Sequence, residues 1–222
     1  MKERGMIFNG EMVRAILSGR KTQTRRPILW RQTPYTEVAM ANDGMPWPWS
    51  EDCERGGDIW HHCPFGNVGD RIWVRETWGV MSYEFDDLGL MVDYIPDRPA
   101  KAIHEMPFGS GHYSGHVIYA ADGDATWCDD DGWEDGRSRW KPSTHMPRWA
   151  SRITLEITGV RVERLHDISD EDAEAEGVDP ETLSYRSPSC GFLDLWESLY
   201  GVDNRKSNPW VWVIEFKVVS DE

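Results

Sequence analysis

The sequence predicts an α+β fold: a small, mostly antiparallel β-barrel with two or three helices and long loop insertions. Segments rich in β-forming residues, in part with alternating polarity, predict strands over 71–78, 153–165 and 209–219. Apolar side chains at helical spacing predict the helices, and two long stretches without periodicity predict the insertions. We expect one domain over residues 1–222, with insertions at about 28–67 and 79–140.

The chain opens with a short predicted strand at residues 6–8, followed by a helix. Asn9 is a suitable N-cap, because its side chain can accept a hydrogen bond from the first turn. The helix has one apolar face, formed by Met12, Val13, Ile16 and Leu17. Gly19 then ends the helix, since a residue without Cβ adopts the left-handed conformation at least cost.

Residues 19–27, Gly-Arg-Lys-Thr-Gln-Thr-Arg-Arg-Pro, hold an amine, hydroxyls and guanidinium groups within one short stretch. If residues 22–26 are extended, Thr24 shares a face with Arg26, and Gln23 shares the other with Arg25. Lys21 is three residues from Thr24. This odd separation lets the two converge only if a turn lies between them or at Lys21, and Gly19 favours such a turn.

The middle of the chain alternates between irregular stretches and strands. Proline and glycine interrupt residues 28–67, which we expect to have little regular structure, and residues 79–115 are also irregular. Strands are predicted at 71–78 and, briefly, at 116–120. The acidic, glycine-containing residues 122–140 predict a solvated loop.

The last third of the chain contains the clearest patterns. The alternating strand at 153–165 is followed by Ser169, which starts a capping box and a short acidic helix that ends near Gly177. A second helix is predicted at 192–200, where four apolar residues share one face. The most hydrophobic strand, at 209–219, closes the chain.

Charge and composition limit the possible partners. With 24 basic and 39 acidic residues the net charge is -15, which disfavours a long nucleic-acid footprint and suits a small substrate better. The exception is a local basic patch formed by Arg14, Arg20, Lys21, Arg25, Arg26 and Arg31. No segment predicts a signal peptide or a membrane span, so we expect a cytoplasmic protein with free thiols.

Neither a metal nor another cofactor is predicted. Cys53, His61, His62 and Cys63 invite a zinc site, but their spacing matches no common zinc motif, and adjacent ligands are awkward.

The arrangement of a helix that leads into residues 19–26 resembles the ASCH domain, a relative of the PUA fold. In that domain a helix leads into a Gly-x-Lys-x-x-Glu-x-Arg motif at the mouth of a small β-barrel. Here Thr24 stands where the commonest form has Glu. This Gly-Arg-Lys-Thr-x-Thr form is similar to a subgroup of small ASCH amidohydrolases that cleave N4-acetylcytidine. The closing strand at 213–217 is similar to the subgroup's last strand. The long insertions look more like the longer ASCH proteins often found in phages and prophages.

This resemblance implies the site. It implies that Lys21 and Thr24 are catalytic, together with a Glu in the short acidic helix after a central strand. The match through Leu165, Ala173 and Glu174 leads to Glu176 as that third catalytic residue.

The chemistry needs a nucleophile, a base and a donor for the leaving amine. Thr24 supplies the hydroxyl. Lys21 can be the base if burial and neighbouring arginines make it neutral; alternatively, Lys21 stays cationic and stabilises the oxyanion while Glu176 is the base. Arg26, with Arg25 beside it, would hold a substrate carbonyl or phosphate, and Trp78 could stack on the base.

The sequence thus predicts a metal-independent amidohydrolase that converts N4-acylated cytosine nucleosides to cytidine and a carboxylic acid. One alternative is a non-catalytic module that binds RNA or single-stranded nucleic acid through the basic patch and stacking aromatics. Another is an RNA-cleaving member of the same superfamily. The net charge of -15 disfavours both alternatives.

Overall fold

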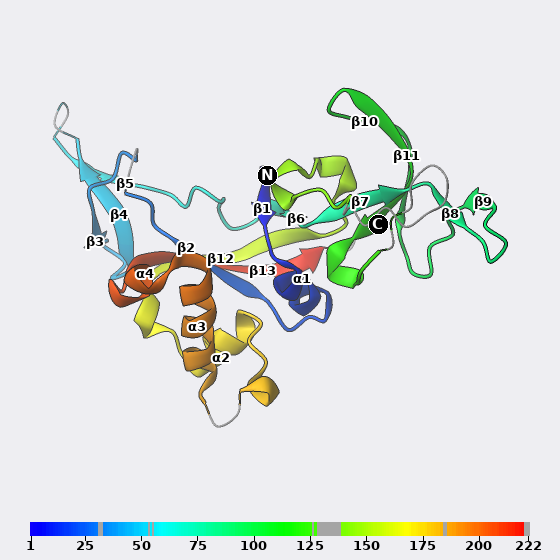
Figure 1. Ribbon diagram of the computed structural model, residues 1–222. Helices are drawn as coiled ribbons and strands as arrows, with labels where there is room; N and C mark the ends of the chain where they lie inside the picture. Colours follow the sequence, from blue (N-terminus) through cyan, green and yellow to red (C-terminus); the bar gives the residue numbers. More distant parts are fainter. Residues whose placement is uncertain are drawn as a thin grey trace. The chain divides into compact units, whose positions relative to one another are not determined.

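The computed structural model describes residues 1–30, 33–52, 54, 56–125, 127, 139–183 and 186–219 (Figure 1). The chain divides into two compact units. Unit 1 comprises residues 1–4, 15–72 and 155–222, and unit 2 comprises residues 5–14 and 73–154. The sheets are mostly antiparallel and the helices few, which confirms the α+β class. No closed barrel is found among the described strands, so the barrel is not confirmed, and the single domain stays a prediction.

The predicted order of a strand and a helix at the N-terminus is confirmed, although the strand lies at 3–7 rather than 6–8. Strand β1 (Glu3–Ile7) is followed by helix α1 (Gly10–Leu17). The Asn9 side chain accepts a hydrogen bond of 2.8 Å from the backbone N–H of Met12. Gly19 has φ +75°, the left-handed conformation expected where the helix ends. Strand β1 lies beside β6 (Arg71–Arg75).

Strands distant in sequence are neighbours in the five-stranded sheet, whose order is β1, β6, β12 (Thr154–Arg164), β13 (Trp210–Val219) and β2 (Gln23–Pro27). β13 and β2 are antiparallel, with Thr24 opposite Ile214 and Arg25 opposite Val213. The basic stretch is therefore a strand held by the most hydrophobic strand of the chain.

Helices α2 (Asp170–Ala175) and α3 (Pro188–Tyr200) belong to unit 1, with the short helix α4 (Val202–Lys206) after them. They pack on β13 around a core of Leu165, Ile168, Ala173, Phe192, Trp196, Val211 and Val213. The Ser169 side chain caps α2, as its sequence predicts. α3 begins four residues before the predicted start, because Ser187 caps it ahead of Pro188. Short 3-10 helices lie at Leu165–Asp167 and Pro180–Thr182.

The expectation of little regular structure over 28–67 is wrong. Strands β3 (Glu37–Met40), β4 (Pro46–Glu51) and β5 (Asp58–Trp60) form an antiparallel sheet there. Two prolines in β4 conceal the strand, since proline is rare in sheets. Trp47 of β4 packs on Trp212 of β13, with ring centroids 5.8 Å apart, so burial of aromatic rings stabilises this sheet despite its prolines.

The expectation of irregular structure over 79–115 is also wrong. Strands β10 (Lys101–Phe108), β11 (Gly111–Tyr119) and β7 (Trp78–Met81) form one sheet, and β8 (Tyr83–Phe85) pairs with β9 (Met91–Asp93). The register of β10 shifts between Ile103 and Met106, and Glu105 has φ +48°. Such a bulge breaks the two-residue alternation by which a strand is recognised. Residues 126 and 128–138 of the second predicted insertion lie outside the described residues.

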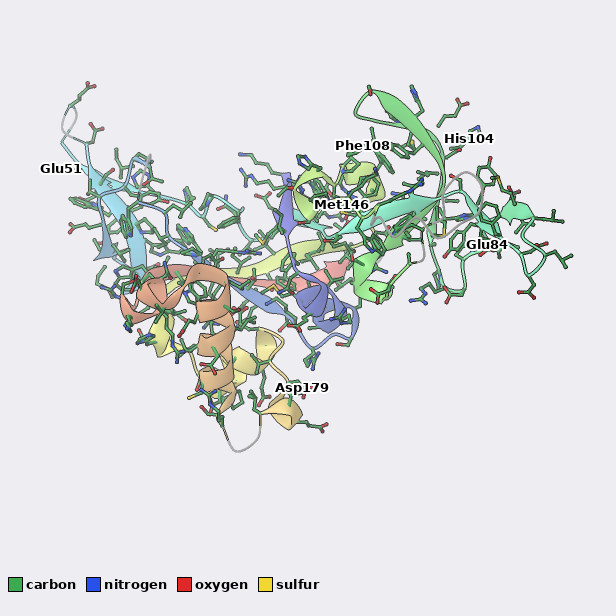
Figure 2. The ribbon with its side chains drawn as sticks, in the orientation of Figure 1. Glu51, Glu84, His104, Phe108, Met146 and Asp179 are labelled. Atoms are coloured by element: carbon green, nitrogen blue, oxygen red, sulfur yellow. The ribbon has the colours of Figure 1, made fainter. Side chains whose placement is uncertain are left out.

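The core of unit 2 is aromatic. Trp78, fully buried, meets Phe108 and Trp149 edge to face, with ring centroids 5.2 and 5.4 Å apart. Figure 2 labels Phe108 and Met146 of this core. A guanidinium also lies in this unit: Arg152 binds both the Glu76 and the Asp122 carboxylates. Short 3-10 helices lie at Ala120–Asp122, Ser143–His145 and Arg148–Ala150. Among the described residues, no helix is long and apolar enough to cross a membrane.

Candidate active site

The turn after α1 fixes the position of Lys21. The Lys21 backbone N–H donates to the Ala15 carbonyl at 2.9 Å, and the Thr22 N–H donates to the Ala175 carbonyl at 2.8 Å. Phe216 of β13 in turn donates to the Thr22 carbonyl at 2.8 Å. These backbone bonds tie the end of α1, the end of α2 and strand β13 together around Lys21.

Lys21 and Glu176 form a buried ion pair, 155 residues apart in sequence. The Lys21 Nζ donates to Glu176 Oε2 at 2.7 Å and to the Glu176 carbonyl oxygen, also at 2.7 Å. The side chains are 0% and 2% exposed. Burial lowers the pKa of Lys21, and its attraction to Glu176 offsets this only in part. The structure thus brings together two of the three predicted catalytic residues.

Gly177, the residue after Glu176, makes this approach possible. Its φ of +97° ends α2, and a Cβ at this position would lie 3.0 Å from the Ala15 Cβ and 3.1 Å from the Lys21 Cβ. A side chain there would be strained twice, by conformation and by contact. The glycine lets Lys21 approach the C-terminal end of α2 closely.

Arg25 holds the other oxygen of Glu176. Its Nη1 donates to Glu176 Oε1 at 3.3 Å, and its Nη2 donates to Asp172 at 2.7 Å and to Glu163 at 2.9 Å. The Arg25 side chain is fully buried. Because its terminal nitrogens donate hydrogen bonds to three carboxylates, Arg25 orients Glu176. The sequence instead led us to expect that Arg25 faces the substrate.

A second arginine completes this carboxylate cluster. Arg161 of β12 donates to Asp172 at 2.8 Å and also binds Glu163 and Glu215. Burial raises the pKa of Asp172, but the hydrogen bond and charge of Arg25 and the charge of Arg161 outweigh it and leave the pKa lowered. Asp172 therefore remains an anion that anchors both guanidinium groups.

Thr24 and Arg26 point to the other face of β2. Gln23 donates to the Asp172 carbonyl at 2.8 Å and Arg25 binds the Asp172 carboxylate, so these two share the face that α2 covers. Because successive strand residues alternate, Thr24 and Arg26 lie on the opposite face. Thr24 is 2% exposed, and its hydroxyl makes no hydrogen bond to Lys21 or Glu176 in the described part of the chain.

The remaining predicted site residue, Trp78, lies in the core of unit 2 and is 0% exposed. It leaves no ring face for a substrate base to stack on. Three residues of the basic patch bind carboxylates: besides Lys21 and Arg25, Arg20 donates to Asp179 at 2.7 Å. Arg31 lies outside the described residues.

Sequence reasoning missed Arg161, Glu163 and Asp172. A signal was present for each: Asp172 holds the acidic position of the capping box that starts at Ser169, and Arg161 and Glu163 are two residues apart on one face of a predicted strand. Among the described residues, no group of three or more His, Cys, Asp or Glu side chains could hold a metal ion.

Comparisons of the chain with protein-family models, with curated proteins and with solved structures find no match. The likeness to ASCH amidohydrolases therefore rests on the motif and the other matching residues described above.

Proposed function

We propose that the chain is an amidohydrolase that cleaves the amide of N4-acylated cytosine nucleosides, releasing cytidine and a carboxylic acid. The observation that carries the proposal is the buried Lys21–Glu176 pair with its lowered Lys21 pKa. Strongly perturbed, paired ionisable groups are typical of sites that transfer protons. Lys21 of this pair follows α1 closely and lies inside the motif that resembles the amidohydrolase subgroup, whereas Glu176 lies at the C-terminal end of α2.

Lys21 is the base in this proposal. A neutral amine has two N–H donors and one lone pair, and Lys21 Nζ already directs two hydrogen bonds to the Glu176 carboxylate and carbonyl. Its lone pair then remains to accept a proton. Arg25, fixed by three carboxylates, keeps Glu176 in place throughout.

Thr24 is the nucleophile. Its oxygen bonds to the acyl carbon as its proton passes to Lys21 Nζ; the C–N4 bond then breaks, and the proton goes to the leaving amine. Water hydrolyses the acyl-threonine, which releases the acid and restores the hydroxyl. This requires the Thr24 hydroxyl and Lys21 Nζ to come within hydrogen-bond reach of each other when substrate binds. Arg26, on the same face as Thr24, binds the substrate carbonyl.

Nucleic-acid binding is the weaker candidate. Phosphate recognition needs cations that are free to meet the backbone. Lys21, Arg25 and Arg20 instead bind carboxylates of their own unit. The net charge of -15 also disfavours binding of a nucleic acid.

The test is chromatographic: purified protein is incubated with N4-acetylcytidine, and the appearance of cytidine is measured. Wild type should turn over, whereas Thr24→Ala and Lys21→Met should each lose at least ~100-fold in rate. Because Lys21 must be neutral, kcat/KM should rise with pH until its lowered pKa is passed.

Matched controls lie next to the residues tested. Thr22→Ala changes an exposed threonine two positions before Thr24, and Glu174→Gln changes an exposed glutamate of α2, two positions before Glu176. Both should retain wild-type turnover, while Glu176→Gln should lose it. Full activity in Thr24→Ala or Lys21→Met would overturn the assignment of that residue. Absence of turnover by folded wild type would overturn the reaction.

A further inference from the structure

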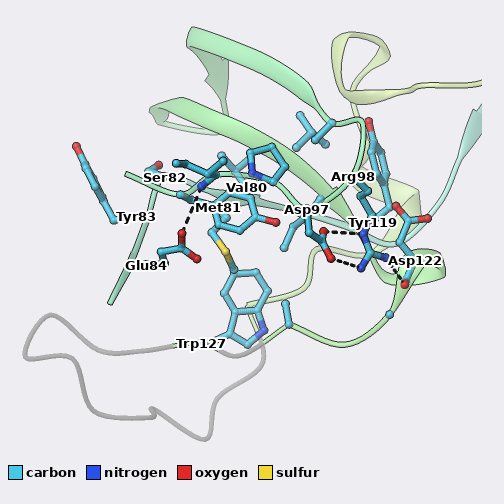
Figure 3. A pocket seen from close by; sticks show the side chains of 18 of the residues that line it. Val80, Met81, Ser82, Tyr83, Glu84, Asp97, Arg98, Tyr119, Asp122 and Trp127 are labelled. Carbon is cyan, nitrogen blue, oxygen red and sulfur yellow. Dashed lines mark hydrogen bonds and ion pairs between the residues drawn. The ribbon is translucent and has the colours of Figure 1, made fainter. Parts of the chain in front are cut away.

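Unit 2 contains a pocket of about 700 Å³ (Figure 3). Strands β7, β8, β9 and β11 contribute to its lining, together with residues 94–100, 122–125, 127, 139 and 140. Small-molecule sites typically measure ~300–1,000 Å³. Neither Lys21 nor Glu176 lines it, so the pocket is separate from the proposed hydrolytic site.

The pocket is rich in aromatic rings, contributed by Tyr83, Phe85, Tyr94, Tyr119, Trp127 and Trp140. Trp127 and Trp140 meet edge to face, with centroids 5.4 Å apart. A Cβ on Gly79 of β7 would lie 3.0 Å from Trp127 and 3.4 Å from Trp140, so the glycine lets both indoles pack directly on the strand. Tyr83 is 58% exposed.

The cationic side chain of Arg98 is already engaged at this pocket. It donates twice to the Asp97 carboxylate at 2.8 Å and once to the Asp122 carbonyl at 2.6 Å. Arg152 in turn binds the Asp122 carboxylate at 2.7 and 2.8 Å. Asp97 is thus paired with Arg98, and Asp122 is paired with Arg152, which also binds Glu76.

Two further carboxylates line the pocket, Glu84 and Asp124, and Arg98 and Arg139 are the two guanidinium groups in the lining. Within the described residues, neither Glu84 nor Asp124 forms an ion pair. The Glu84 Oε1 accepts only a long hydrogen bond of 3.4 Å, from the Ile95 N–H. The pocket therefore combines aromatic faces with an excess of negative charge.

We propose that this pocket binds an organic cation that carries an aromatic or apolar body. Aromatic faces attract cations through the ring quadrupole, and a carboxylate adds direct attraction. An anionic ligand such as a nucleotide would meet the uncompensated Glu84 and Asp124. The overall charge of -15 also raises the local concentration of cations and lowers that of anions.

The test uses the full chain and three probes that share one ring: benzyltrimethylammonium, benzyl alcohol and benzenesulfonate. Dissociation constants are measured by titration calorimetry at low salt. The cation should bind at least tenfold more tightly than the neutral or the anionic probe. Equal or tighter binding of either of these would overturn the proposal.

Two variants locate the site. Glu84→Gln should weaken binding of the cation about fivefold, while Glu11→Gln, which removes an exposed charge from another part of unit 2, should leave it unchanged. Trp127→Ala should weaken binding by at least fivefold. An equal affinity in wild type and Glu84→Gln, or the same loss in Glu84→Gln and Glu11→Gln, would place the cation elsewhere and overturn the proposal.

Discussion

A double-mutant cycle on Lys21 and Glu176 tests how much of the stability of unit 1 depends on this pair. The variants are Lys21→Met, Glu176→Gln and the two combined. Methionine retains the length of the lysine stem without its charge, and glutamine retains the shape of the carboxylate. Each single change leaves one group of a buried pair without its main partner, whereas the double variant leaves neither charge.

The structure sets the expected magnitudes. At an effective dielectric constant of ~20, unit charges 2.7 Å apart attract by about 6 kcal/mol, which the cost of desolvating two ions largely offsets. Breaking a buried pair costs ~3–5 kcal/mol. Lys21→Met should lower the free energy of unfolding by ~3 kcal/mol, because Arg25 still contacts Glu176 at 3.3 Å. Glu176→Gln should cost about 2 kcal/mol, since Lys21 keeps the Glu176 carbonyl and can lose its proton.

The losses of unfolding free energy in the two single variants should therefore not be additive. We expect the double variant to lose about 3 kcal/mol rather than the sum of the single losses, which gives a coupling of about 2 kcal/mol. Urea unfolding at pH 7, followed by circular dichroism and tryptophan fluorescence, measures each value. Glu174→Gln serves as the surface control and should change stability by less than ~0.5 kcal/mol.

The pH dependence of the free energy of unfolding tests independently whether the pKa of Lys21 is lowered in the folded protein. The pKa of Lys21 is lowered in the folded protein, so between that pKa and 10.5 the unfolded chain binds more protons. Stability then rises with pH across this window, by at most ~1.4 kcal/mol per pH unit. Glu176→Gln removes the attraction that raises the Lys21 pKa, so this variant should gain more between pH 7 and 10 than wild type. Additive losses, or equal pH slopes in wild type and Glu176→Gln, would refute a buried ionic pair.

Two further predictions concern single positions. Gly177→Ala should lower the free energy of unfolding by about 1–3 kcal/mol and slow turnover, because its Cβ would press on Lys21. The control is Gly57→Ala, whose Cβ would meet nothing within 4 Å and which should leave stability unchanged. Urea unfolding of both variants measures the difference. Burial raises the pKa of Cys63 to about 11, so its thiol should react with a disulfide reagent at pH 8 far more slowly than in urea, and equally fast labelling would contradict its burial.

Local patterns predicted those parts of the fold that local physics determines. The helix between Asn9 and Gly19 was predicted from a cap, an apolar face and a terminating glycine, each of which acts within a few residues. The β10–β11 hairpin was missed because Glu105, in a bulge, interrupts the alternation. Trp47 is stabilised by Trp212, 165 positions later, a contact that no local window contains.

The candidate site shows the same division. Alternation along β2 correctly put Gln23 and Arg25 on one face, but only the packing of α2 shows that this face receives carboxylates. Lys21, which precedes the strand, joins that face through the turn at Gly19, and Thr24 lies on the other side of the strand. The proposed chemistry therefore requires a movement that brings the Thr24 hydroxyl to Lys21. Because β13 holds the backbone of Thr24 and backbone hydrogen bonds hold the turn at Lys21, that movement must come from the side chains.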